Sequence, residues 1–137
     1  MKKIIHCDGG AFIEPPEYKF HDGYFSVVGE NGELLHFEKE IKDIYSANEC
    51  EYLAIKWAVK NIKDRPLRIT SDCLCAIAWA NHSTPTSIKR NRPPLNLKEI
   101  ELIYQKYNLA DIWNAENYSP KYIPKEIKSG DKTYLTQ

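Results

Sequence analysis

The sequence predicts one α/β domain spanning residues 1–137, built on a five-stranded mixed sheet in which two parallel strands are added to three antiparallel ones, flanked by helices. Three observations predict this class. The length suits a single domain. The first 40 residues hold strand-like segments separated by turn signals, and strand-like and helix-like segments alternate after them. The chain also shows no internal repeat, low-complexity tract or domain boundary.

The first three strands are expected to form an antiparallel unit. They are predicted at residues 3–8, 24–28 and 34–40. The first ends at the turn signal Gly9-Gly10, and Asn31-Gly32 is a strong hairpin signal between the second and the third. Residues 13–23 contain two consecutive prolines and are expected to be a loop.

A helix is predicted to follow. Ser46 and Glu49 have the spacing of a capping box, in which each side chain satisfies a backbone N–H at the helix start. The helical pattern ends before Pro66, residues 67–71 are predicted to be a strand, and residues 72–79 a second helix. This strand, helix, strand, helix order implies a parallel segment.

The remaining elements are expected to be a third helix and a last strand. Residues 83–96 carry three prolines and form a connection. Asn96-x-x-Glu99 resembles a second capping box, followed by an apolar stripe at helical spacing. The stripe consists of Leu97, Ile100, Tyr104 and Tyr107. Residues 110–116 alternate as a strand, and no element is predicted in the final twenty residues.

Composition and charge narrow the classes of function. Basic and acidic residues number 19 each, so the formal net charge is zero, which argues against tight non-specific binding to a polyanion. No stretch approaches the ~20 apolar residues needed to cross a bilayer. Residues 1–8 lack the apolar run of a signal peptide. We therefore expect a cytoplasmic protein with no membrane partner.

The four cysteines are expected to be reduced thiols. Cys73 and Cys75 could bind zinc together with Cys50, but their spacing matches none of the usual zinc patterns. Burial as small apolar residues is the favoured interpretation. Core packing is likewise favoured for Trp57 and Trp79.

Three acids stand out by their places in the predicted elements. Asp8 ends the first strand, Asp72 ends the fourth, and Glu51 lies in the first turns of the intervening helix. The C-terminal ends of parallel strands share one edge of a sheet, where open α/β folds place their sites. The strand before the helix, however, is expected to run antiparallel to the first strand. Glu51 then reaches Asp8 only if residues 41–45 cross the sheet.

Each acid also has an ordinary structural interpretation. Asp72 could cap the second helix, Asp8 could open a turn, and Glu51 could favour the positive end of its helix. Glu49 is the other candidate on that helix, but its capping-box position and its phase, away from the core-facing side, favour Glu51. An unpaired buried carboxylate is costly, and a shared divalent cation would supply Glu51 with a partner.

Three segments together resemble the ribonuclease H family, over roughly residues 1–116: Ile4–Gly10, Ser46–Ala54 and Ile69–Asp72. The family's first Asp lies in a strand and precedes a Gly, matched by Asp8-Gly9. Its Glu lies three residues after an Asn, matched by Asn48 and Glu51, and its second Asp closes the fourth strand, matched by Asp72. The spacings of 43 and 21 residues also fit. The resemblance implies a ribonuclease-H-like fold in which the three acids meet.

The resemblance also implies a two-metal-ion nuclease. The implied catalytic residues and metal ligands are Asp8, Glu51, Asp72 and Asp131. They would hold two Mg²⁺ ions about 4 Å apart, which Mn²⁺ could replace, to activate a water and stabilise the leaving oxygen. Asp131 stands where the family has a fourth acid, although a turn after Ser129-Gly130 explains it equally well. The family's loop His has no counterpart here, since no His follows His82.

The implied substrate is the RNA strand of an RNA–DNA hybrid, cut by a monomer. Asn48 matches a family position at the minor groove of the hybrid, and Ser46 one near the DNA phosphates. Lys89, Arg90, Arg92 and Lys98 give a local charge of +4 that either holds a nucleic-acid backbone or is a solvated loop, and the family's basic protrusion is shortened. The predicted substrate-binding residues are Gly9, Gly10, Ser46, Asn48, Lys89, Arg90 and Arg92.

Two alternatives keep the fold. One is a structure-selective DNA nuclease that uses the same metals. The other is a catalytically inactive module that binds nucleic acid or protein. The absent loop His and the weak match around Asp131 favour the inactive module, and the three intact acids argue against it.

Overall fold

The computed structural model describes residues 3–14, 19–42, 44, 46–82 and 94–106. These residues form five strands and two helices: β1 (Lys3–Glu14), β2 (Lys19–Gly29), β3 (Leu34–Ile41), α1 (Ala47–Asn61), β4 (Leu67–Ser71), α2 (Leu74–Asn81) and β5 (Ile100–Tyr104). Neither of these helices has the length and apolar character needed to cross a bilayer.

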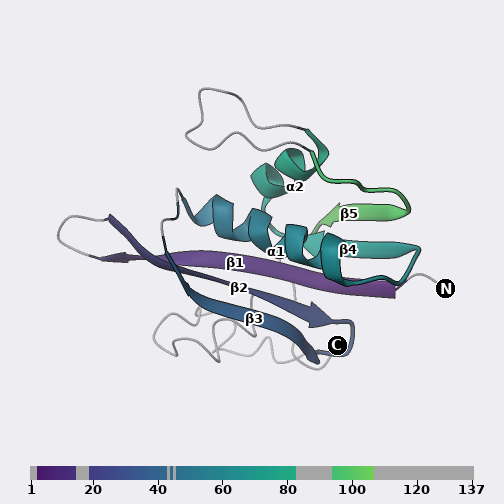
Figure 1. The fold of residues 1–137 in the computed structure, drawn as a ribbon, viewed down its shortest axis with the longest axis horizontal. Helices are drawn as coiled ribbons and strands as arrows, with labels where there is room; N and C mark the ends of the chain where they lie inside the picture. The colour runs from purple at the N-terminus through teal and green to yellow at the C-terminus, as the bar shows by residue number, and fades with distance from the viewer. Residues whose placement is uncertain (1–2, 15–18, 43, 45, 83–93, 107–137) are drawn as a thin grey trace.

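The strands form one mixed sheet in the order β3-β2-β1-β4-β5. β2 is antiparallel to both of its neighbours, whereas β4 pairs in parallel with β1 and with β5. Both helices lie on one side of the sheet (Figure 1). The predicted sheet of three antiparallel strands with two parallel additions is confirmed.

β1 and β3 run in the same direction, because each is antiparallel to β2. The expectation that the third strand runs antiparallel to the first is wrong, since two successive reversals restore the original direction. β3 therefore ends at the end of the sheet toward which β1 runs, and α1 begins there and packs on β1 and β2 (Figure 1). The start of α1 reaches the middle of β1 without crossing from the opposite end of the sheet.

The first hairpin is longer than predicted. β1 continues to Glu14 and β2 begins at Lys19, so most of the predicted loop at 13–23 is strand. The ladder includes Gly10 and Gly23, with a bulge next to them. Gly10 belongs to the predicted turn signal and Gly23 to the predicted loop, but a strand tolerates glycine at a bulge or where another segment approaches closely.

The helix predicted from Asn96-x-x-Glu99 onward is wrong. The Oδ1 atom of Asn96 accepts a hydrogen bond from the backbone N–H of Lys98 at 3.2 Å, and Glu99 has a φ of 59°, which interrupts a helix. The chain then enters β5, which pairs along the whole length of β4. A short apolar run fits both the helical and the strand periodicity. Pairing with the open edge of β4 favours the strand here. The strand predicted at 110–116 lies outside the described residues.

α1 has the predicted start but not the predicted cap. Ser46 occupies the N-cap position, yet its side chain makes no capping hydrogen bond, so this half of the capping box is wrong. The backbone carbonyl of Ser46 instead accepts from the N–H of Glu49 at 3.1 Å. Glu49 is 3% exposed, although its phase predicted a position away from the core. The first turn of α1 lies close against both β1 and β2, which buries more of its circumference.

The core lies between the sheet and the two helices. Its buried members include Ile5, Cys7, Phe25, Val27, Tyr52, Ile55, Ala58, Leu67 and Ile69. Trp57 and Trp79 are partly buried against it, as predicted. Trp57 also stacks on His36, with ring centroids 4.3 Å apart. This packing makes β1, β4 and α1 a rigid frame.

Replacing a core side chain tests this packing. Ile69 is 0% exposed, and we expect Ile69→Ala to lower the free energy of unfolding by about 2–5 kcal/mol, because it removes buried methyl groups and leaves a cavity. Leu74 is 63% exposed, so Leu74→Ala should change it by less than about 0.5 kcal/mol. Urea unfolding followed by circular dichroism measures both, and equal effects would contradict the described core.

Candidate metal centre

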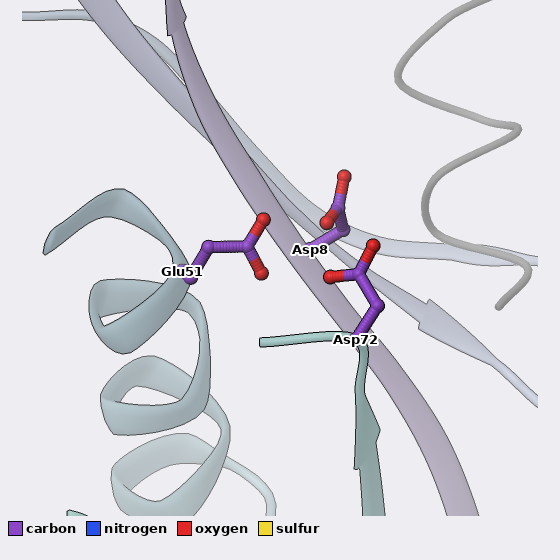
Figure 2. Close-up of side chains that lie close together, drawn as sticks. All are labelled: Asp8, Glu51 and Asp72. Carbon is purple, nitrogen blue, oxygen red and sulfur yellow. The ribbon is translucent and has the colours of Figure 1, made fainter. Parts of the chain in front are cut away.

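Three acidic side chains from distant parts of the sequence converge on one point. Asp8 lies in β1, Glu51 in α1, and Asp72 directly after β4 (Figure 2). Each offers a carboxylate oxygen, and these oxygens all lie within 4.8 Å of one another. Asp8 and Glu51 are 6% and 9% exposed, and Asp72 is half-buried. The cluster therefore has two buried members and one that reaches toward the surface.

The parallel pairing of β1 with β4 sets Asp8 beside Asp72. The last paired residues are His6 and Thr70, and each stands two positions before an acid. His6 Nδ1 and Thr70 Oγ1 are 2.6 Å apart. Side chains alternate along a strand, so His6 shares a face of β1 with Asp8. Burial lowers the pKa of His6 below its ordinary 6.5, which favours the neutral ring in this hydrogen bond.

Asp72 does not cap the helix that follows it. α2 is capped by Cys73, whose Sγ accepts a hydrogen bond from the N–H of Ala76 at 3.4 Å. The hydroxyl of Ser71 accepts from the N–H of Cys73 at 3.1 Å. The capping interpretation of Asp72 is therefore wrong. The neighbours of Asp72 build the turn, and its carboxylate is directed toward the other two acids (Figure 2).

The predicted substrate residues Ser46 and Asn48 lie at the start of α1, and both are half-buried. The thiol of Cys73 donates a hydrogen bond to Asn48 Oδ1 at 3.4 Å. This contact ties the first turn of α1 to the turn that carries Asp72. Sequence reasoning missed Cys73, because it treated the cysteines as small buried apolar residues and assigned the possible cap of α2 to Asp72.

Gly9 and Gly10, also predicted to contact substrate, lie against other parts of the fold. Gly9 is buried beneath the first turns of α1, and Gly10 lies beside the ring of Tyr24. Their contact with substrate stays a prediction.

Four predicted site residues lie outside the described residues: Lys89, Arg90, Arg92 and Asp131. Their roles also stay predictions. Lys98, the fourth member of the basic group, is described and exposed.

Cysteines contribute no metal site in the described part of the chain. All four are free thiols, and the group of potential ligands that converges there is the acidic one. Burial raises the pKa of Cys50 to about 12. Burial, followed by the nearby charges of Glu51 and Asp8, raises the pKa of Cys7 well above its ordinary value. Such thiols stay protonated and behave as small apolar core residues.

The donor set fits a hard divalent cation. Carboxylate oxygens are the ligands that Mg²⁺ and Mn²⁺ prefer, whereas structural zinc sites use thiolate and imidazole. Three carboxylates held this close repel one another, and a bound cation offsets that repulsion. The residues present therefore fit the magnesium implied by the resemblance.

No protein-family model matches this chain, and no curated protein matches it in sequence. Solved structures similar to this chain include the three that follow. The solution structure of the PFV RNase H domain is similar at 14% identity and a TM-score of 0.49, over 77% of this chain and 79% of that one. LC11-RNase H1 in complex with an RNA/DNA hybrid is similar at 17% identity and a TM-score of 0.43, over 75% and 84%. Native prototype foamy virus protease-reverse transcriptase is similar at 14% identity and 0.48, over 96% and 20%.

Removing one charge from the cluster should stabilise the metal-free protein. In EDTA we expect Asp8→Asn to raise the free energy of unfolding by about 1 kcal/mol, because it relieves repulsion among buried carboxylates. Added Mn²⁺ should raise the melting temperature of the parent protein and leave that of Asp8→Asn nearly unchanged.

Asp64→Asn is the matched control for this comparison. Asp64 forms an exposed ion pair with Lys3, with Nζ and Oδ2 2.7 Å apart, so its replacement should have little effect with or without metal. A lower stability of Asp8→Asn in EDTA would contradict the repulsion argument.

Proposed function

We propose that this protein is a magnesium-dependent endoribonuclease that cleaves the RNA strand of RNA–DNA hybrids. The observation that carries the proposal is the convergence of Asp8, Glu51 and Asp72 within 4.8 Å. Three buried or half-buried carboxylates this close repel one another, and a bound cation would offset that repulsion.

The three acids differ in burial, and we propose that they hold a cation in different ways. Asp8 and Glu51 are buried on a strand and a helix of the rigid frame, so their oxygens are fixed in position. Asp72 lies directly after β4 and is the most exposed of the three acids, so we propose that a phosphodiester approaches the metal ions from its side. Two Mg²⁺ ions held here would supply a water of lowered pKa and offset charge on the leaving 3′ oxygen.

The start of α1 supports recognition of the nucleic acid. Asn48 Oδ1 accepts from Cys73, so its amide NH₂ is the group directed to a hydroxyl or base acceptor of the substrate. The Ser46 hydroxyl does not cap the helix and can bond a phosphate. A minor groove lined with 2′-hydroxyls offers the acceptors that distinguish RNA from DNA.

A local group of basic residues supports binding of the substrate. The chain is neutral overall, so affinity depends on a few placed contacts and not on bulk attraction. We propose Lys89, Arg90 and Arg92 as the phosphate-binding residues and Asp131 as the fourth metal ligand. Both assignments rest on sequence position.

The experiment that tests the proposal offers four labelled substrates with Mg²⁺: an RNA–DNA hybrid, duplex DNA, duplex RNA and a four-way DNA junction. We expect cuts only in the RNA of the hybrid, and none in EDTA. Cutting of the junction alone would support the DNA-nuclease alternative instead. Binding of the hybrid without any cut would support the inactive module.

Single substitutions connect activity to the cluster. Asp8→Asn and Asp72→Asn should each lower the rate at least ~100-fold, because each removes a charged ligand oxygen. Asp64→Asn should retain activity within about twofold, since Asp64 is exposed and is not a member of the acidic cluster. Hybrid cleavage by Asp8→Asn at the parent rate would refute the assignment.

A further inference from the structure

The start of α1 rests on the sheet with no space between helix backbone and strand. A Cβ atom added to Gly9 would lie 2.5 Å from both the carbonyl carbon and the oxygen of Cys50, and 2.8 Å from the backbone nitrogen of Glu51. Ordinary carbon contacts are about 3.5–4 Å. The atoms in the way belong to the main chain, so no side-chain rotation makes room.

Gly23, on the neighbouring strand β2, lies against the side chain of Cys50, whose backbone lies against Gly9. A Cβ atom there would collide with Cys50 Sγ and would lie 3.2 Å from two methyl carbons of Ile44. Cys50 is 0% exposed, and Gly9 and Gly23 therefore form the floor beneath its backbone and its thiol. Neither glycine has a positive φ, so the position demands space and not an unusual backbone conformation.

We infer that Gly9 and Gly23 are positioning residues, which set the depth of α1 on the sheet so that Glu51 meets Asp8 and Asp72. Glu51 directly follows Cys50, and Gly9 directly follows Asp8, so the close approach joins two members of the cluster through their own backbones. This inference rests on the proposed metal site, because it assigns the two glycines to that site.

Small displacements matter in such a site. Relief of the Gly9 contact needs a shift of about 1 Å, from 2.5 Å to the ordinary contact distance. Metal–ligand distances tolerate only ~0.2 Å, and the first turns of α1, which contact Gly9, would shift by more than this. Glu51 would then leave the cluster while the rest of α1 stays packed on the core through Ile55 and Ala58.

The test measures Mn²⁺ binding by titration calorimetry on the full chain without nucleic acid. Gly9→Ala and Gly23→Ala are each made alone and together with Cys50→Ala. Gly29→Ala is the matched control, because it is a glycine of the same sheet and the three atoms nearest to its added Cβ belong to the carboxylate end of the flexible Glu33 side chain. Circular dichroism and urea unfolding report which variants are folded.

We expect Gly9→Ala to weaken Mn²⁺ binding about tenfold or more, with Cys50→Ala giving no recovery, because the obstructing atoms are main-chain atoms. Gly23→Ala should weaken binding less, about threefold to tenfold, and Cys50→Ala should restore it by removing the thiol. Gly29→Ala and Cys50→Ala alone should stay within about twofold. This difference in rescue would not arise from a general loss of stability.

The outcomes separate this inference from the proposed function. If the parent protein does not bind Mn²⁺, both the metal site and the role of the glycines are refuted. If the parent binds and folded Gly9→Ala binds equally well, only the role of the glycines is refuted. If Gly9→Ala does not fold, the Gly23→Ala pair decides: a loss restored by Cys50→Ala supports the inference, and unchanged or unrestored binding overturns it.

Discussion

Parallel pairing between β1 and β4 is the constraint on which the candidate site depends. It aligns His6 with Thr70, so the acids two positions later on each segment arrive at the same place. Without this register Asp8 and Asp72 would belong to unrelated surfaces. The hydrogen bond between the His6 ring and the Thr70 hydroxyl joins the two strands at their last paired position, two residues before the acids. The ladder beneath thus determines the spacing of the two aspartates.

The cluster stores unfavourable electrostatic energy that the rest of the fold must offset. Buried carboxylates in close proximity oppose folding, and a compact hydrophobic core lies directly behind them. Ile5 and Cys7 are buried in the core, on the face of β1 opposite to its polar face. The Cys7 thiol donates a hydrogen bond to the carbonyl of Ala54 in α1 at 3.6 Å. The same strand therefore anchors the helix on one face and presents an acid on the other. Sites that bind charged ligands commonly trade stability for function in this way.

One turn of α1 serves two purposes at once. Ser46 and Asn48 stand at its beginning, where polar groups can meet a substrate, while Glu51 turns inward to the acids. Cys73 connects this turn to the segment after β4 through Asn48. The proposed substrate contacts and the proposed metal ligand Glu51 therefore share one end of α1, and we expect a change in the seating of α1 on Gly9 to affect both.

From the amino-acid sequence we could predict the first three strands as an antiparallel unit, the extent of β4 and the identity of the three acids. The strands follow from local signals such as Asn31-Gly32 and Pro66. The three acids follow from the spacing of the motifs that resemble the ribonuclease H family. The sequence did not show that residues 100–104 form a strand, that Cys73 and not Asp72 caps α2, or how deeply α1 sits on the sheet. The strand and the depth of α1 each depend on a partner far away in the chain, such as the open edge of β4. Periodicity within one segment contains no information about that partner.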